Sequence, residues 1–203
     1  MITNLAHARG PAGYGQRMRL RILLAAVCTA VALIGLSTIV FAKHGEPKSV
    51  RVTLKNVNGA AVGLATLTAA SAKTVDVRVN VSRLQPGFHG FHIHAVGTCT
   101  PPDFTSAMGH LKTTDQRHGA HVGDMSSLLV KGNGTATLRL TTDRFSLADL
   151  SDADGSAVMV HAGPDNFANI PPRYAPDGPD QATLDTGDSG ARVACGEIAA
   201  AKP

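Results

Sequence analysis

Apolar and polar residues alternate with a period of two along several segments of the chain. Successive side chains of a strand point to opposite faces, so this alternation predicts strands that are half buried. Predicted strands cover residues 49–57, 74–84, 88–96, 135–142, 156–163 and 191–199, with 61–70 as a weaker candidate. Residues 131–134 (KGNG) predict a hairpin turn after a further short strand, SSLLV. Helical periodicity is scarce, and 144–152 is expected to hold one short helical turn.

About eight strands with little helix predict an all-β fold, an antiparallel sandwich or barrel. The length fits one domain, and a hydrophobic content of 43% is enough to form a core. Two connections, residues 97–125 and 164–190, are too long for ordinary hairpins. Because loops of this length in a compact domain are usually functional or disordered, and histidines cluster around these two, we expect them to form a site.

The first 42 residues differ from the rest in charge and hydropathy. Residues 1–21 are arginine-rich and lack acidic groups, and the uncharged apolar run 22–42 follows them. A basic flank before an apolar run predicts export. The run exceeds the usual signal core of about 7–15 residues and matches the roughly 20 that span a bilayer, so it is either a cleaved signal or a retained anchor. Lipid attachment at Cys28 is a third alternative, which Val27 before it disfavours.

We expect residues 43–203 to form the folded domain, outside the cytoplasm. From Lys43 onward 15 Lys and Arg face 15 Asp and Glu, and the chain has no Trp and two Tyr. The electrostatic footprint of a nucleic-acid-binding protein is therefore missing. Cys99 and Cys195 are the cysteines of this part, and an oxidising compartment favours a disulfide between them.

Histidines carry the candidate chemistry of the chain. His92 and His94 are two residues apart in a predicted strand, so both project to one face as a clamp for an ion, while His89 belongs to the other face and is expected to bond a buried backbone group. The further candidate ligands are His110, His118, His121, Asp124 and His161. This set is too large for one tetrahedral site and too small for two closed ones, so two ions sharing an imidazolate fit best. All-imidazole coordination suits copper, and histidines with a carboxylate suit zinc.

Five ordered motifs between residues 50 and 198 give the chain a family resemblance. They are GFHGFHIHAVGTC, GH at 109–110, HGAHVGD, VMVHAGPDN and GARVACG. This set resembles the copper/zinc superoxide dismutase family in its exported bacterial form. The resemblance implies an eight-stranded Greek-key β-barrel or sandwich. It also implies an enzyme that converts superoxide to oxygen and hydrogen peroxide by alternate reduction and oxidation of copper, as a defence against extracellular superoxide.

The resemblance also implies a role for each site residue. The implied copper ligands are His92, His94, His110 and His161, and the implied zinc ligands are His110, His118, His121 and Asp124. His110 would bridge the two ions and transfer a proton. Asp165 resembles the carboxylate that orients one copper-binding and one zinc-binding imidazole. Arg192 resembles the arginine that holds the substrate anion, and Cys99 and Cys195 match the family's disulfide.

Some positions depart from the family pattern. Two residues separate His118 from His121, so the zinc loop is shortened, and Glu197 replaces a small apolar residue, so the last strand is expected to be solvated there. Residues 163–191 carry five aspartates against Arg173 alone, which predicts weak electrostatic steering of the anion.

Oligomeric state and two rival functions stay open at this point. The family includes monomers and dimers, so the sequence leaves the choice between a monomer and a homodimer open. One rival function is a non-catalytic copper- or zinc-binding module. The other is a zinc hydrolase, which needs three protein ligands and an activated water.

Overall fold

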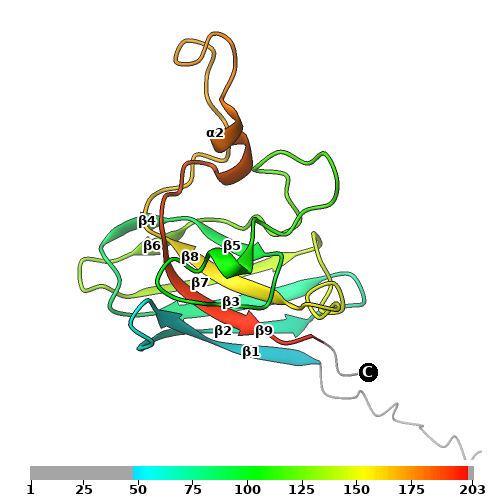
Figure 1. The fold of residues 1–203 in the computed structure, drawn as a ribbon. Coiled ribbons are helices and arrows are strands. Elements are labelled where there is room, and N and C mark those ends of the chain that lie inside the picture. The colour runs from blue at the N-terminus through cyan, green and yellow to red at the C-terminus, as the bar shows by residue number, and fades with distance from the viewer. Residues whose placement is uncertain (1–47, 201–203) are drawn as a thin grey trace, which may run out of the picture. The chain divides into compact units, whose positions relative to one another are not determined.

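The computed structural model describes residues 48–200, which form a nearly all-β fold (Figure 1). The strands are β1 (Ser49–Asn56), β2 (Ala61–Ala69), β3 (Val75–Val81), β4 (Gly87–His89), β5 (Phe91–His94), β6 (Leu128–Val130), β7 (Ala136–Thr142), β8 (Ser156–His161) and β9 (Arg192–Ile198). Two short helices accompany them, η1 (Thr105–Ala107) and α2 (Gln181–Thr186). The predicted segments 1–21 and 22–42 lie outside the described residues. Within 48–200, no helix has the length and apolar character needed to cross a membrane.

Seven strands form one antiparallel sheet in the order β5-β8-β9-β1-β2-β3-β7, and β4 pairs with β6 in a separate ribbon. β4 leads into β5 across Gly90, and β6 contacts β7. Because β5 and β7 are the two outer strands of the large sheet, the ribbon connects its edges and the sheet curls toward a barrel. The predicted all-β barrel or sandwich is confirmed.

Strand β3 shows how the alternating pattern builds the core. Its four valines at 75, 77, 79 and 81 are buried, whereas Asp76, Arg78 and Asn80 between them are exposed. The valines pack in a cluster with large side chains from other strands, including Leu54, Leu67, Phe91 and Leu128. Full burial of one such side chain contributes about 1.5–3 kcal/mol, so the sheet's inner face supplies much of the stability.

Two expected elements differ in the structure. The predicted strand 88–96 is divided at Gly90, whose N–H donates to Gly163 and whose carbonyl accepts from His161, each at 2.9 Å. This change of partner lets β4 pair with β6 while β5 pairs with β8. The helical turn expected within 144–152 is a turn instead, in which the Ser151 N–H donates to the Ala148 carbonyl at 3.2 Å.

The first long connection, 97–125, is bound along β5 by backbone hydrogen bonds. The N–H of Ile93 donates to the Gly123 carbonyl at 2.9 Å, and the Ile93 carbonyl accepts from Leu111 at 2.8 Å. A side chain at Gly123 would overlap the Ile93 carbonyl, so only glycine allows this approach. The contacts bring His110 and Asp124 of the loop beside His94 and His92 of β5.

A disulfide ties the same connection to β9. Cys99 and Cys195 are bonded with their Cα atoms 5.8 Å apart, which confirms the expected pairing. Cys195 lies in β9 three residues after Arg192. The start of the loop is thereby held next to the strand that carries the candidate anion-binding arginine.

Candidate metal centre

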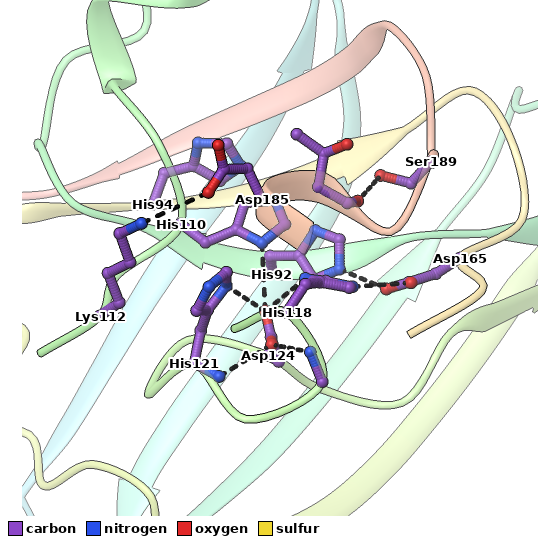
Figure 2. Close-up of polar contacts among 12 residues, drawn as sticks. His92, His94, His110, Lys112, His118, His121, Asp124, Asp165, Asp185 and Ser189 are labelled. Carbon is purple, nitrogen blue, oxygen red and sulfur yellow. Dashed lines mark hydrogen bonds and ion pairs between the residues drawn. The ribbon is translucent and has the colours of Figure 1, made fainter. Parts of the chain in front are cut away.

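Four buried histidines form the first group of the centre. The candidate ligand atoms of His92, His94, His110 and His161 lie within 4.8 Å of one another. β5 supplies two of these residues, the neighbouring strand β8 supplies His161, and the first loop supplies His110. Figure 2 shows three of them, His92, His94 and His110, side by side. The predicted copper-binding residues are thus all brought together.

Hydrogen bonds to the backbone fix the orientation of two of these rings. Nδ1 of His94 donates to the Met108 carbonyl, and Nδ1 of His161 donates to the Gly190 carbonyl, each at 2.9 Å. A neutral imidazole that donates from Nδ1 keeps a lone pair on Nε2. The two Nε2 atoms lie 3.3 Å apart. Two lone pairs at this distance repel unless a cation lies between them, so the arrangement fits a metal.

His92 has one ring nitrogen bonded and the other without a partner. Its Nε2 lies 2.7 Å from Oδ2 of Asp165, and its buried Nδ1 has no hydrogen-bond partner among residues 48–200. Burial lowers the pKa of His92 to about 4 and that of His161 to about 3, and it holds the pKa of His94 well below its ordinary value. The rings are therefore neutral near pH 7, as imidazole ligands of a metal must be.

The second group surrounds one carboxylate oxygen. Oδ1 of Asp124 lies 3.1 Å from Nδ1 of His110, 3.2 Å from that of His118 and 3.4 Å from that of His121. Tetrahedral zinc with bonds of about 2.0 Å separates its ligand atoms by roughly 3.3 Å, which matches these distances. Oδ2 accepts the N–H groups of Gly119 and His121 at 2.7 and 3.0 Å and so directs Oδ1 at the three rings. The shortened loop therefore still offers a complete set of donors.

His110 is the residue able to serve both groups. The tightest second group contains His92, His110, His118 and Asp124, with His121 slightly further out. The ring centroid of His92 also lies 4.0 Å from that of His110, but Asp165 occupies Nε2 of His92 and leaves one nitrogen for one ion. His110 faces Asp124 with Nδ1 and keeps Nε2 for the first group.

Asp165 connects the two groups. Its Oδ1 lies 2.7 Å from Nε2 of His118, and its Oδ2 lies 2.7 Å from Nε2 of His92, as Figure 2 shows. Burial lowers the pKa of His118, but the carboxylates of Asp124 and Asp165 outweigh it and raise that pKa to about 9, so a cation that binds this ring displaces a proton. Burial raises the pKa of Asp165, but the bonds from His118 and His92 outweigh it and hold the carboxyl ionised. Asp165 therefore fixes one ring of each group.

An open cleft of about 600 Å³ gives access to the first group. His94, His110 and His161 line it together with Arg192. Arg192 donates to the carbonyls of Phe104 at 2.6 Å and Met108 at 2.7 Å, which uses two of its five N–H donors. Burial lowers the pKa of Arg192, yet a guanidinium stays charged near neutral pH. The cleft therefore offers an anion a fixed cation beside the imidazoles.

Sequence reasoning missed two residues that support the centre. Arg144 donates to the carbonyls of His121 at 2.9 Å and Gly119 at 3.0 Å and so holds the short loop between His118 and Asp124. Gly187, with φ +61°, lies where any side chain would collide with the bond between Asp165 and His118. No local motif marks either position, because their partners are distant in sequence.

Two other expectations concern residues next to the centre. The ring nitrogens of His89 lie 2.6 Å from the His161 carbonyl and 2.8 Å from the Gln85 carbonyl, so its expected backbone-bonding role is confirmed. Glu197 is exposed as expected, and its carboxylate also accepts the Cys99 N–H at 2.8 Å.

Comparison with known proteins places this geometry in a family. The model of the family described as copper/zinc superoxide dismutase matches residues 61–198. The chain belongs to this family. It is 45% identical over 151 residues to "Superoxide dismutase [Cu-Zn]" of Mycobacterium tuberculosis, a match that covers 67% of this chain and 60% of the relative. The matched segment thus spans less than two thirds of that relative's length.

Solved structures share the fold. The structure of the copper/zinc superoxide dismutase of Brucella abortus matches with a TM-score of 0.59 and 28% identity, over 74% of this chain and 99% of that one. A superoxide dismutase-like protein of Bacillus subtilis matches with a TM-score of 0.62 and 29% identity, over 73% and 97%. Both matches cover nearly the whole of the solved chain, so those chains consist of this domain.

The donor sets fit the two metals that the family implies. Among residues 48–200, buried Nδ1 atoms that form no hydrogen bond occur at His92, His118 and His121, although those of His118 and His121 face Oδ1 of Asp124. A buried polar atom left without a partner costs free energy, and three of them within two facing groups are explained when cations accept their lone pairs. The four-imidazole group suits copper, and the three-imidazole group with a carboxylate suits zinc.

Proposed function

We propose that this chain converts superoxide to oxygen and hydrogen peroxide with one bound copper and one bound zinc ion. The observation that carries the proposal is the shared position of His110, which belongs to a four-imidazole group and also faces Asp124 of the second group. In this assignment His92, His94, His110 and His161 hold copper, and His110, His118, His121 and Asp124 hold zinc. Bound copper supplies one-electron redox chemistry, which zinc does not.

Arg192 binds and orients the substrate anion in this proposal. Two carbonyls hold its guanidinium in place, and its remaining donors are available to the cleft that His94, His110 and His161 line. A permanent positive charge lowers the free energy of a small anion that enters beside the imidazoles. The same charge favours binding of the superoxide anion over binding of neutral oxygen, so the oxygen product is released.

His110 supplies a proton in the step that forms hydrogen peroxide. Asp124 holds its Nδ1 at 3.1 Å, so the ring keeps its orientation while Nε2 gains or loses a proton on the cleft side. Peroxide requires protons to leave as hydrogen peroxide, and Nε2 is the titratable atom placed to supply one. His118, His121 and Asp165 serve structure by fixing Asp124 and His92.

Metal content and superoxide consumption, measured on the same sample, test the proposal. We expect about one copper and one zinc per chain, rapid superoxide consumption, loss of that activity on chelation, and its return when copper and zinc are added together. A chain that holds only zinc and hydrolyses esters or peptides would be a zinc hydrolase. A chain that holds both metals without consuming superoxide would be a binding module, and either result would refute the enzyme.

We also propose that residues 43–203 are the folded unit and that the chain acts outside the cytoplasm. Support comes from the disulfide, which persists in oxidising compartments, and from the basic and apolar composition of residues 1–42. Cell fractionation with detection of the intact and shortened chain tests both points. Recovery of the protein in the reduced cytoplasmic fraction would refute the proposed location.

A further inference from the structure

Three exposed arginines form a row across the outer face of the sheet, away from the metal centre. Arg51 of β1 pairs with Thr66 of β2, Thr66 pairs with Arg78 of β3, and Arg78 pairs with Arg139 of β7. The pairing register therefore places Arg51, Arg78 and Arg139 in one line, which we call the arginine row. The residues on either side of each arginine in its strand face the opposite side of the sheet.

The arginine row forms no ion pair within the part of the chain that the structure describes, although Asp76 lies two residues from Arg78 on the same face of β3. None of its members forms an ion pair or a side-chain hydrogen bond there. Adjacent strands lie about 4.8 Å apart, so Arg78 and Arg139 stand directly opposite each other at that spacing. Like charges in this position repel and destabilise a sheet. Binding of an external anion would remove this repulsion.

The surface around the row is an open, polar hollow. Its volume is about 790 Å³, and it is lined by the arginine row together with the threonines at 66, 68 and 141. Asp76, the acidic residue of the lining, accepts the Thr141 hydroxyl at 2.6 Å. Guanidinium groups bind phosphate oxygens bidentately, and hydroxyls add further donors, so the hollow matches phosphate esters in chemistry.

We propose that the arginine row docks the domain on anionic lipid headgroups of a membrane. The position of the row in the chain favours this occupant over a soluble polyanion. The apolar run 22–42 ends seven residues before Ser49, the first residue of β1, and Arg51 lies in that strand. If the run lies in a bilayer, even an extended linker holds β1 within about 25 Å of its surface.

Docking by this face is compatible with access to the metal centre. The hollow and the cleft share no lining residue. β1 and β2 also lie well away from α2 and the loop before it (Figure 1). A domain bound through the arginine row therefore leaves the cleft open to solvent, where superoxide would arrive.

Vesicle co-sedimentation of the domain from Lys43 onward tests the inference. We expect binding to phosphatidylcholine vesicles that contain phosphatidylglycerol, no binding to phosphatidylcholine alone, and a fall in binding as salt rises. Each basic residue near an anionic membrane strengthens partition about fivefold, so the triple variant R51Q/R78Q/R139Q should bind on the order of a hundredfold more weakly. Its metal content should match that of the wild type, and its melting temperature should be equal or slightly higher, because the repulsion between Arg78 and Arg139 is removed.

The matched control is the triple variant K55Q/K73Q/K131Q, which has the same net charge and changes exposed residues outside the hollow. It should keep vesicle binding within a few-fold of the wild type. An equal loss in both triple variants would show only general charge attraction and would overturn the inference. Binding to inorganic polyphosphate without binding to anionic vesicles would also overturn it, because the partner would then be a soluble polyanion.

Discussion

His94 and His161 face each other through Nε2 atoms 3.3 Å apart, although each ring donates its Nδ1 proton to a backbone carbonyl. Neither Nε2 therefore has a proton to offer the other. The two rings are buried on the neighbouring strands β5 and β8, where water does not screen the repulsion between the Nε2 atoms. This repulsion lowers the free energy of unfolding of the metal-free protein. A cation between the two nitrogens turns this repulsion into attraction.

Metal removal should therefore lower the melting temperature. A ligand that binds only the folded state adds about 4 kcal/mol at a thousand times its dissociation constant, so adding back copper and zinc should raise the melting temperature by several degrees or more. Differential scanning calorimetry of the chelated and reloaded protein measures both changes. Identical melting curves would contradict the assignment of the two histidine groups as metal sites.

Replacement of Arg192 by alanine should leave both metals bound and slow turnover several-fold or more. Within residues 48–200 the side chain forms no hydrogen bond to a candidate ligand, and its two hydrogen bonds go to the carbonyls of Phe104 and Met108. Arg192→Lys should restore part of the rate, because an ammonium keeps the charge but does not reproduce the planar fork. Metal analysis beside the dismutation rate checks the prediction, and unchanged turnover in the alanine variant would refute the role of Arg192.

Gly187→Ala should weaken metal binding. A Cβ at this position collides with Oδ1 of Asp165 and Nε2 of His118, so the bond between these two residues must break. Loss of such an orienting contact typically costs 10- to 100-fold in metal affinity, and zinc should be affected first. Competition with a chelator measures the change.

The matched control for this variant is Gly178→Ala. Gly178 also has a left-handed backbone, with φ +87°, but nothing lies within 4 Å of the added carbon. Both substitutions therefore carry a similar backbone penalty, and only the collision differs. Equal zinc affinity in the two variants would show that the collision at position 187 does not disturb the metal site and would contradict the prediction.

Removal of the disulfide should reduce both stability and turnover. The bond joins residues 96 positions apart, and the chain-entropy model assigns about 4–5 kcal/mol to a closed loop of this length. The double variant C99S/C195S should lose part of this stability in denaturant unfolding. Its turnover should fall as well, because Phe104 and Met108, which hold Arg192, lie in the loop that the bond ties down. The reduced wild type should behave like the variant, and undiminished stability of both would contradict the prediction.

Local patterns were sufficient to predict most of the strands and the candidate histidines that the structure brings together. The alternation in β3 directly marks its buried valines, and the spacing of His92 and His94 places both on one strand. The division at Gly90 was not predictable in this way, since it depends on hydrogen bonds to His161, the last residue of β8, and to Gly163 just after it. The alternation of apolar and polar residues predicts which side chains are buried, but it does not predict where a strand changes its pairing partner.

Contacts between distant segments account for what the sequence did not reveal. Arg144 supports the centre through carbonyls more than 20 positions away, and Gly187 is required by a bond between Asp165 and His118. The residues next to Arg144 and Gly187 in the sequence form no pattern that would predict these two roles. Periodicity cannot predict which residues far apart in the sequence contact each other. The family resemblance predicted such contacts, including those of Asp165 with His92 and His118.

Charge at the mouth of the cleft should make the rate only weakly dependent on ionic strength. Asp185 and Asp188 line the cleft, and Asp185 lies 3.6 Å from Nζ of Lys112, with both side chains about half exposed. The acidic group offsets the lysine, so little net positive potential draws the anion in.

Asp185→Asn should free Lys112, raise the rate roughly twofold at low salt, and make the rate fall more steeply with added salt. Asp177→Asn, in the same loop but outside the cleft, is the matched control and should change neither. A steep salt dependence of the wild-type rate would show that another positive group, and not the lysine that Asp185 offsets, governs capture of superoxide.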